Sequence, residues 1–296
     1  MAGLCAAARA RELGAEPVVL EKGSRPGGSM LISSCVVWRF GTFEDFRAEC
    51  PGGDEALQRA VFDGFDEALV RAAGDVRLEA ELQGDELPLV LATGGFAVRY
   101  AREHGLLVRS NPWSEGDGLD FARKHGASTA GDLDEFYGRA MPAPPARIGE
   151  EDYVRLSQLW DGEARFVNEN GEEFFQGPPA WHESDLAQAI ARQPGGTAWF
   201  VVPAELRDDA RVVALRDAGG TVVEEDGELR LHVAAAVTHT QGGIRVNPDG
   251  SVPGVDGLFA AGADVGGIST GGYSSGLAAA LVLGRIAAQG YVSGCK

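Results

Sequence analysis

The fold is decided by residues 258–277, LFAAGADVGGISTGGYSSGL. The apolar run at residues 258–261 predicts a buried strand, which ends in a glycine and the acid Asp264. Five glycines then lie between residues 266 and 276, directly before the apolar residues 274–289, which predict a buried helix. Glycines before a helix leave backbone N–H groups open to an anion or a polarised carbonyl, so this stretch indicates a ligand site. A plain loop is the alternative, although one rarely joins a buried strand to a buried helix.

The amino-terminal residues predict a second part of such a site. An Ala-rich helix is expected over residues 3–13, and a short apolar strand over residues 17–20 ends in Glu21. In a dinucleotide-binding unit, an acid at this place accepts hydrogen bonds from the ribose hydroxyls. The first strand of such a unit and two of its three glycines have no counterpart before Gly3. An ordinary helix–strand unit with a solvated Glu21 is therefore the alternative.

A third segment with bare backbone is residues 91–96, LATGGF. A strand expected over residues 87–92 runs into Thr93-Gly94-Gly95, and ligands of doubly wound sheets bind where such strands end. A tight turn between the strand and the next helix is the alternative. The other expected elements are a helix over residues 54–73 and strands over residues 233–237 and 242–246.

Composition and charge exclude several classes of function. The chain has 296 residues, of which 44% are hydrophobic and 24% are charged, so a globular protein of about two domains is expected. Its net charge of −18 disfavours a nucleic-acid partner and an anionic membrane surface, because both attract clustered Lys and Arg. We expect no membrane span, since no run of the ~18 apolar residues that a span needs is evident. The four cysteines, Cys5, Cys35, Cys50 and Cys295, show no C-x-x-C spacing, which favours a reduced, cytoplasmic chain.

The character of the sequence changes between residues 97 and 225, which hold four of the five tryptophans. Helices mixed with short strands are expected there, whereas both ends of the chain show an α/β pattern. We therefore predict a discontinuous α/β domain over residues 1–96 and 226–296, with a second domain inserted over residues 97–225.

Six motifs occur in a recognisable order. They are Glu21-Lys22 with Gly27-Gly28-Ser29, the LATGGF segment, Glu115-Gly116-Asp117-Gly118, Arg165-Phe166-Val167-Asn168-Glu169, His239-Thr240-Gln241-Gly242-Gly243 and Gly257-Leu258-Phe259-Ala260-Ala261-Gly262. In this order they resemble the FAD-dependent oxidoreductases similar to the fumarate reductase and succinate dehydrogenase flavoprotein subunits and to 3-ketosteroid 1-dehydrogenases. The resemblance implies an α/β fold in which a Rossmann-like FAD-binding domain, built from both ends of the chain, carries an inserted α+β capping domain.

The resemblance also implies which residues bind FAD. Glu21 would hold the adenosine ribose, Gly28 and Ser29 would run beside the flavin and the pyrophosphate, and the backbone at Gly276 would face the C2 carbonyl of the flavin. The full set implied by the resemblance is Gly3, Glu21, Lys22, Gly28, Ser29, Thr93, Gly94, Asp117, Asp264, Gly276 and Leu277. No histidine neighbours Gly28-Ser29, so non-covalent FAD is expected.

Two residues are predicted to handle protons. His239 matches a histidine that contacts substrate in the fumarate reductases, and a satisfied core histidine is the alternative. Tyr273 stands where those enzymes place an arginine, and the Thr-Arg-Asp that follows their R-F-V-N-E motif is absent here. Without such arginines a C4 dicarboxylate would be held poorly. Tyr273 could instead donate a hydrogen bond to a ketone, as tyrosines do in ketosteroid dehydrogenases, or simply pack over the flavin.

The inserted domain contains further candidates. Phe174, Phe175 and Trp181 fit either an apolar lid over a substrate or plain core packing, and His182 and Glu183 are secondary candidates for the site.

The predicted function is therefore that of an FAD-dependent oxidoreductase. It would act on a C–C bond next to a carbonyl of a small organic acid or a cyclic ketone, with an unidentified electron donor or acceptor. The alternative is a non-catalytic remnant that binds FAD weakly or not at all. The missing first strand and the short stretch at residues 74–86 favour this alternative, and they lead us to expect a natural start upstream of Met1.

Overall fold

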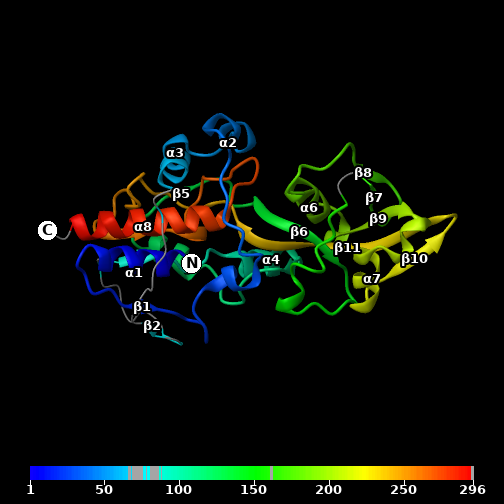
Figure 1. The fold of residues 1–296 in the computed structure, drawn as a ribbon, viewed down its shortest axis with the longest axis horizontal. Helices are drawn as coiled ribbons and strands as arrows, with labels where there is room; N and C mark the ends of the chain where they lie inside the picture. The colour runs from blue at the N-terminus through cyan, green and yellow to red at the C-terminus, as the bar shows by residue number, and fades with distance from the viewer. Residues whose placement is uncertain are drawn as a thin grey trace. The chain divides into compact units, whose positions relative to one another are not determined.

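The protein was analysed as a computed structural model that describes residues 1–65, 68, 76–77, 79–80, 87, 89–160 and 163–294 (Figure 1). The chain divides into two compact units. The first unit comprises Met1–Arg99, Asn111–Glu135 and His239–Lys296, and the second comprises Tyr100–Ser110 and Phe136–Thr238.

These boundaries differ from those expected at residues 97 and 226. Strand β11 is one continuous strand over Glu228–Thr240, and it carries most of its residues into the second unit. Residues 111–135 stay in the first unit, because β5 (Thr129–Ala130) pairs there with β12 (Gly243–Ile244). Both unit boundaries are thus set by pairing between strands that lie far apart in the sequence. The amino-acid composition, on which the expected boundaries are based, does not reveal such pairing.

Two helices form the centre of the first unit. Helix α1 (Ala2–Glu12) lies along α8 (Gly276–Gly294), as the blue and red helices of Figure 1 show. A Cβ atom at Gly284 would lie 2.4 Å from the carbonyl oxygen of Ala2, so the two backbones meet too closely for a side chain there. The small residues of the Ala-rich helix therefore serve close packing, as the sequence predicts.

By length and composition α8 could cross a membrane, so the expectation that no such stretch exists is wrong. Half of the most apolar window of this helix is buried inside the protein, and its buried residues include Leu281, Val282 and Leu283. The core helix of a globular protein has the same properties, so a single helix of this kind is weak evidence for a membrane span.

The strands of the first unit form three separate pairs in the described part of the chain. Besides β5 with β12, β1 (Val19–Leu20) pairs in parallel with β2 (Val76–Arg77), and β3 (Leu89–Leu91) pairs in parallel with β13 (Leu258–Ala260). A Rossmann-like domain would join such strands in one continuous parallel sheet. No described strand joins β1 to β3.

Short helices complete the first unit, and side chains cap two of them. Thr42 accepts a hydrogen bond from the backbone N–H of Asp45 at the start of α2, and Asp54 accepts from Ala56 and Leu57 at the start of α3. These helices are η1 (Gly28–Ile32), α2 (Phe43–Glu49), α3 (Glu55–Gly64), α4 (Ala97–His104, which continues into the second unit), α5 (Asp117–Lys124) and η5 (Gly262–Asp264).

Several sequence-based expectations fall partly on residues outside the described ranges. The helix expected over residues 54–73 is described only as α3, which ends at Gly64, and residues 66, 67 and 69–73 lie outside the described ranges. The same holds for Cys295, for Pro88 in the expected strand 87–92, and for residues 74, 75, 78 and 81–86.

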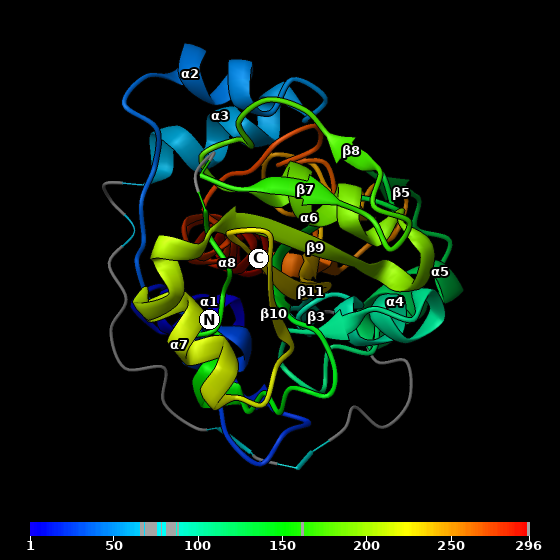
Figure 2. The same ribbon diagram turned by 90° about the vertical axis from the view of Figure 1, so that its right-hand side faces the viewer.

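The second unit is built on a seven-stranded sheet. The strands of this sheet lie in the order β10, β11, β9, β7 and β8 (Figure 2). Strands β4 and β6 also pair with β11. The buried core beside the sheet includes Trp160, Phe166 and Phe200. The remaining strands are β4 (Leu107–Val108), β6 (Phe136–Pro142), β7 (Arg165–Val167), β8 (Glu173–Phe175), β9 (Thr197–Pro203) and β10 (Val222–Glu225). The helices are η2 (Glu150–Asp152), α6 (Ser184–Ala191), η3 (Pro194–Gly196), η4 (Ala204–Asp208) and α7 (Ala210–Asp217).

Candidate functional site

All thirteen residues predicted for the site lie in the first unit, and a buried carboxylate joins two of their segments. Asp264 follows β13 and is 1% exposed. Its Oδ1 accepts hydrogen bonds from Thr93 Oγ1 at 2.8 Å and from the backbone N–H of Gly95 at 2.9 Å, and its Oδ2 accepts from the N–H of Thr93. Burial raises the pKa of Asp264, and these hydrogen bonds oppose the rise. Asp264 therefore anchors the Thr-Gly-Gly turn to the end of the neighbouring strand.

The Thr-Gly-Gly turn makes a tight cradle of backbone. Gly94 and Gly95 have φ angles of +97° and +74°, which glycine adopts without strain. A Cβ atom at Gly94 would lie 3.1 Å from Ser114 Oγ, which is buried and has no hydrogen-bond partner among the described residues. The N–H of Gly118, in the first turn of α5, donates to Thr93 Oγ1 at 3.2 Å. A polar ligand group beside Gly94 would meet an available hydroxyl at this place.

Lys22 and Asp117, both predicted to contact the cofactor, contact each other. Lys22 Nζ lies 2.8 Å from Asp117 Oδ2, with side chains 37% and 54% exposed. An exposed pair of this kind contributes less than about 1 kcal/mol to stability.

Glu21 Oε1 accepts a hydrogen bond from the N–H of Gly23 at 2.8 Å, so the carboxylate at the end of β1 is held in place.

Asn111 and Trp113 join this region, although the sequence did not single them out. The N–H of Asn111 donates to Ser29 Oγ at 3.1 Å, and a Cβ atom at Gly28 would lie 3.4 Å from Asn111 Nδ2. The ring of Trp113 covers Gly23, where a Cβ atom would lie 2.7 Å from ring carbon Cε3. In the sequence, Asn111 and Trp113 are marked only by their place shortly before the Glu-Gly-Asp-Gly motif. A single asparagine gives no sign that its side chain will be buried, so the sequence could not identify Asn111.

Gly3, in α1, lies against the residue that follows β3. A Cβ atom at Gly3 would lie 3.5 Å from the Cβ atom of Ala92, which precedes the Thr-Gly-Gly turn. The start of α1 and the turn are thus neighbours in the first unit.

His239 lies at the amino end of α8. A Cβ atom at Gly276 would lie 3.2 Å from His239 Cε1, so the imidazole packs directly on the backbone where the helix begins and where Leu277 follows. Burial lowers the pKa of His239 to about 4. The imidazole is therefore neutral at pH 7, and it can accept or donate a hydrogen bond without carrying charge.

Tyr273 lies in the glycine loop, which we define as residues 266–276, among aromatic rings. Its ring centroid is 6.5 Å from that of His239 and 6.0 Å from that of Trp38. Trp38 in turn contacts Phe40 at 5.1 Å. Arg39, the neighbouring cation, lies over the ring of Phe62 in α3 and donates to its carbonyl oxygen at 3.3 Å. The ring neighbours of Tyr273 are thus the imidazole of His239 and the indole of Trp38.

The candidates of the second unit have structural roles there. His182 Nδ1 accepts a hydrogen bond from the N–H of Ser184 at 3.1 Å, and Glu183 Oε1 accepts from that of Trp160 at 3.1 Å. Both side chains are buried, at 2% and 5% exposure, whereas Trp181 is 58% exposed. Phe174 and Phe175 pack against the hydrophobic core of this unit. Core packing, the alternative given above for the two phenylalanines, is therefore what they do within the unit.

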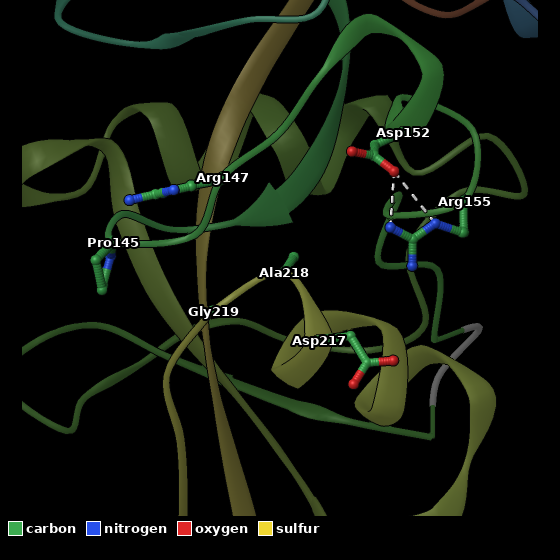
Figure 3. Close-up of a pocket in the computed structure, with 7 residues that line it drawn as sticks. All are labelled: Pro145, Arg147, Asp152, Arg155, Asp217, Ala218 and Gly219. Atoms are coloured by element: carbon green, nitrogen blue, oxygen red, sulfur yellow. Dashed lines mark hydrogen bonds and ion pairs between the residues drawn. The ribbon is translucent and has the colours of Figure 1, made fainter.

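A cavity of about 340 Å³ also lies in the second unit (Figure 3). It contains none of the predicted site residues, and Asp152 on its wall is already bonded to Arg155 at 2.7 Å. Its lining residues are Pro145, Arg147, Asp152, Arg155, Asp217, Ala218 and Gly219. Among the described residues no group of three His, Cys, Asp or Glu side chains could hold a metal ion.

Comparison with known proteins agrees with this geometry. Probable fumarate reductase Ifc3 of Shewanella frigidimarina (strain NCIMB 400) is 26% identical over 263 residues, which cover 67% of this chain and 43% of that relative. The chain thus spans less than half the length of this curated relative. The open conformation of a flavocytochrome c3 fumarate reductase has a TM-score of 0.69 at 20% identity, covering 99% of this chain and 76% of that one. The 3-ketosteroid delta1-dehydrogenase from Sterolibacterium denitrificans has a TM-score of 0.73 at 13% identity, covering 99% and 98%.

At these identities the two solved structures show a shared fold. The family model described as FAD binding domain matches residues 85–276, about two thirds of the chain, and it spans the Thr-Gly-Gly turn, Asp117, His239, Asp264 and Tyr273. The resemblance inferred from the six motifs is thereby confirmed. The protein belongs to the FAD binding domain family.

Proposed function

We propose that the protein is an oxidoreductase that uses non-covalently bound FAD to add or remove hydrogen across a C–C bond next to a carbonyl group. The observation that carries this proposal is the meeting of Tyr273, His239 and the amino end of α8 in one place. A phenol, a neutral imidazole and the N–H groups of Gly276 and Leu277, which precede the capped N–H of Ala278, are together suited to polarise a carbonyl and to move a proton beside it.

The residues of the first unit fit FAD. The buried Ser114 hydroxyl, which lacks a partner among the described residues, and the bare backbone at Gly94 offer hydrogen-bonding groups to a polar part of the cofactor. Glu21 would bond the adenosine ribose, and the start of α8 at Gly276 would face the flavin ring, where its positive dipole favours electron-rich states. When bound, FAD supplies the hydride chemistry of the reaction.

The side chains of this chain supply orientation and proton handling. Tyr273 donates its phenolic hydrogen to the carbonyl oxygen of the substrate, which acidifies the C–H bond beside the carbonyl. His239 is neutral because burial lowers its pKa, so it can accept or donate a hydrogen bond at physiological pH but is a weak base. In the opposite direction the phenol of Tyr273 is the group that can supply a proton.

The rings of Trp38, Phe40 and Tyr273 favour a ring-shaped ketone over a small dicarboxylate. Aromatic walls recognise apolar rings, whereas a dicarboxylate requires bidentate cations. Arg39, the cation closest in sequence to these rings, is engaged with Phe62. A small organic acid remains the other substrate class, and the electron donor or acceptor is unidentified.

In this proposal the first unit binds FAD, the second unit is a capping domain, and the protein acts in the cytoplasm. The non-catalytic alternative is favoured by one observation, that the described strands of the first unit form three separate pairs.

An absorption spectrum of the purified chain, taken before and after FAD is added and the sample desalted, separates the two. Retained flavin absorbance supports the oxidoreductase. The turnover of a cyclic ketone and of fumarate is then measured for the wild type and for the variants Tyr273→Phe and His239→Ala. We expect Tyr273→Phe to lower kcat about 100-fold with FAD retained. A chain that stays colourless with added FAD supports the non-catalytic alternative.

A further inference from the structure

The glycine loop that carries Tyr273 is held by a buried amide from another part of the chain. Gln58 lies in α3 and is 0% exposed, although its helical neighbours Leu57 and Val61 are apolar core residues. Its Nε2 donates hydrogen bonds to the carbonyl oxygens of Ile268 at 2.8 Å and of Cys50 at 2.9 Å. A leucine would fill this place without polar groups, so the amide is present for a directional link.

Arg47 in α2 sets the orientation of this amide. Its Nη1 donates to Gln58 Oε1 at 2.6 Å and to the carbonyl oxygen of Gly53 at 2.8 Å. A guanidinium only donates hydrogen bonds, so the oxygen of the amide must face Arg47. The nitrogen of the amide must then face the carbonyl oxygen of Ile268, in the glycine loop.

The backbone of the loop is pressed against the segment that joins α2 to α3. The N–H of Asp54 donates to the carbonyl oxygen of Gly267 at 2.6 Å, and that of Gly52 donates to the carbonyl oxygen of Thr270 at 3.1 Å. A Cβ atom at Gly272 would lie only 1.7 Å from the carbonyl oxygen of Glu49. A loop with this many glycines would otherwise adopt many conformations, and these contacts select one.

The opposite side of the loop is held as well. Gln241 Nε2 donates to the carbonyl oxygen of Gly272 at 2.9 Å, and the N–H of Gly271 donates to Glu135 Oε1 at 2.8 Å. Tyr273 follows directly, and Trp38, which contacts its ring, lies on the chain that leads into α2. Hydrogen bonds from both sides therefore hold the loop up to the residue before Tyr273.

We propose that Arg47 and Gln58 form a positioning pair that fixes the glycine loop and thereby places Tyr273 for the reaction. The inference rests on the proposed function for its catalytic part, but the hold on the loop is a property of the protein without FAD. Neither residue touches the substrate, so both act through Tyr273.

A double-mutant cycle tests the catalytic part. Gln58→Leu keeps the size and apolar packing of the site and removes the link to Ile268. We expect it to lower kcat about tenfold, with FAD retained, since a displacement of about 1 Å in a reacting group has effects of this size or larger. In a Tyr273→Phe background the same change is expected to have almost no effect, because Gln58 acts through the phenol. Gln289→Leu is the matched control, since Gln289 accepts a hydrogen bond from Arg9 at 3.0 Å on the surface of α8.

Chymotrypsin cleavage after Tyr273 in the FAD-free chain tests the hold on the loop separately. We expect Gln58→Leu to raise the cleavage rate at this bond about tenfold, with the variants compared at equal folded fraction in urea. Gln289→Leu is expected to cleave at the wild-type rate. Unchanged cleavage, or equal effects of Gln58→Leu on kcat in both backgrounds, overturns the proposal. If the wild type neither retains FAD nor turns over a substrate while cleavage still rises, the proposed function fails and the hold on the loop stands.

Discussion

The glycine loop and the amino-terminal strip, which we define as residues 17–37, both belong to the predicted FAD site but are built differently. Hydrogen bonds from Gln58, Gln241 and other distant groups hold the glycine loop. In the strip, Val36 is 60% exposed and Val18 is 48% exposed, and many of its hydrogen bonds join residues a few positions apart. Substitutions around the loop should therefore change stability and reaction together, whereas substitutions in the strip should change FAD affinity with little effect on stability.

Asp264→Ala is expected to have the largest effect on the side of the glycine loop. It leaves the buried N–H of Gly95 without an acceptor, which costs about 1–3 kcal/mol, and it also removes both hydrogen bonds to Thr93. We expect the free energy of unfolding to fall by about 3 kcal/mol or more and FAD retention to be lost, measured by urea unfolding and by absorbance after desalting. Glu228→Gln, at the exposed ion pair with Arg165, is the control. Equal losses in the two variants would contradict the contrast between buried and exposed carboxylates.

The pH dependence of stability sharpens the comparison next, because His239 contacts the helix that follows the loop. Its pKa is lowered from 6.5 to about 4 in the folded protein, so the unfolded chain binds this proton more readily. The contribution of His239 to the free energy of unfolding is fully present above pH 6.5. It is lost as the pH falls toward 4, which lowers the free energy of unfolding by up to about 3 kcal/mol.

His239→Gln should remove this part of the slope, which urea unfolding at a series of pH values measures. His125→Gln, at the end of α5, is the control and should keep it. An unchanged slope in His239→Gln would show that burial of this imidazole does not oppose its protonation.

Gly272→Ala tests how closely the loop is packed. Its Cβ atom would meet the carbonyl oxygen of Glu49, so the backbone must shift, and overpacking of this kind costs about 1–3 kcal/mol. We expect unfolding at correspondingly lower urea and a lower kcat. Gly41→Ala, where no atom lies within 4 Å of the added Cβ, should leave both unchanged. A stable and active Gly272→Ala would mean that the loop has room to move.

Lys22→Met should give the smallest change, and it tests the strip. The pair with Asp117 is exposed, so we expect the free energy of unfolding to change by less than about 0.5 kcal/mol. FAD affinity, measured by fluorescence titration, is expected to change severalfold if Lys22 contacts the cofactor as predicted. A loss of stability as large as that of Gly272→Ala would contradict the comparison, because it would show that the strip contributes to stability as the loop does.

Much of the site could be predicted because its signals are local. The glycines and Asp264, the Thr-Gly-Gly turn, Glu21 after a strand and the apolar closing helix each occupy one short stretch of sequence. Gln58, Asn111 and Ser114 could not be predicted, since a single polar residue in a helix or loop carries no sign of its burial. Their partners lie far away in the sequence, and only the folded chain shows them.

The sequence by itself determined the family, the cofactor class and the candidate residues, because the motifs that carry them each occupy a few residues of chain. Tertiary structure decided that Asp264 anchors the Thr-Gly-Gly turn, that Lys22 pairs with Asp117, and that β11 draws residues 228–238 into the second unit. It also decided the conformation of the glycine loop. Glycine imposes few backbone preferences of its own, so the loop is held by hydrogen bonds from other parts of the chain, including Gln58, which lies 210 positions before Ile268.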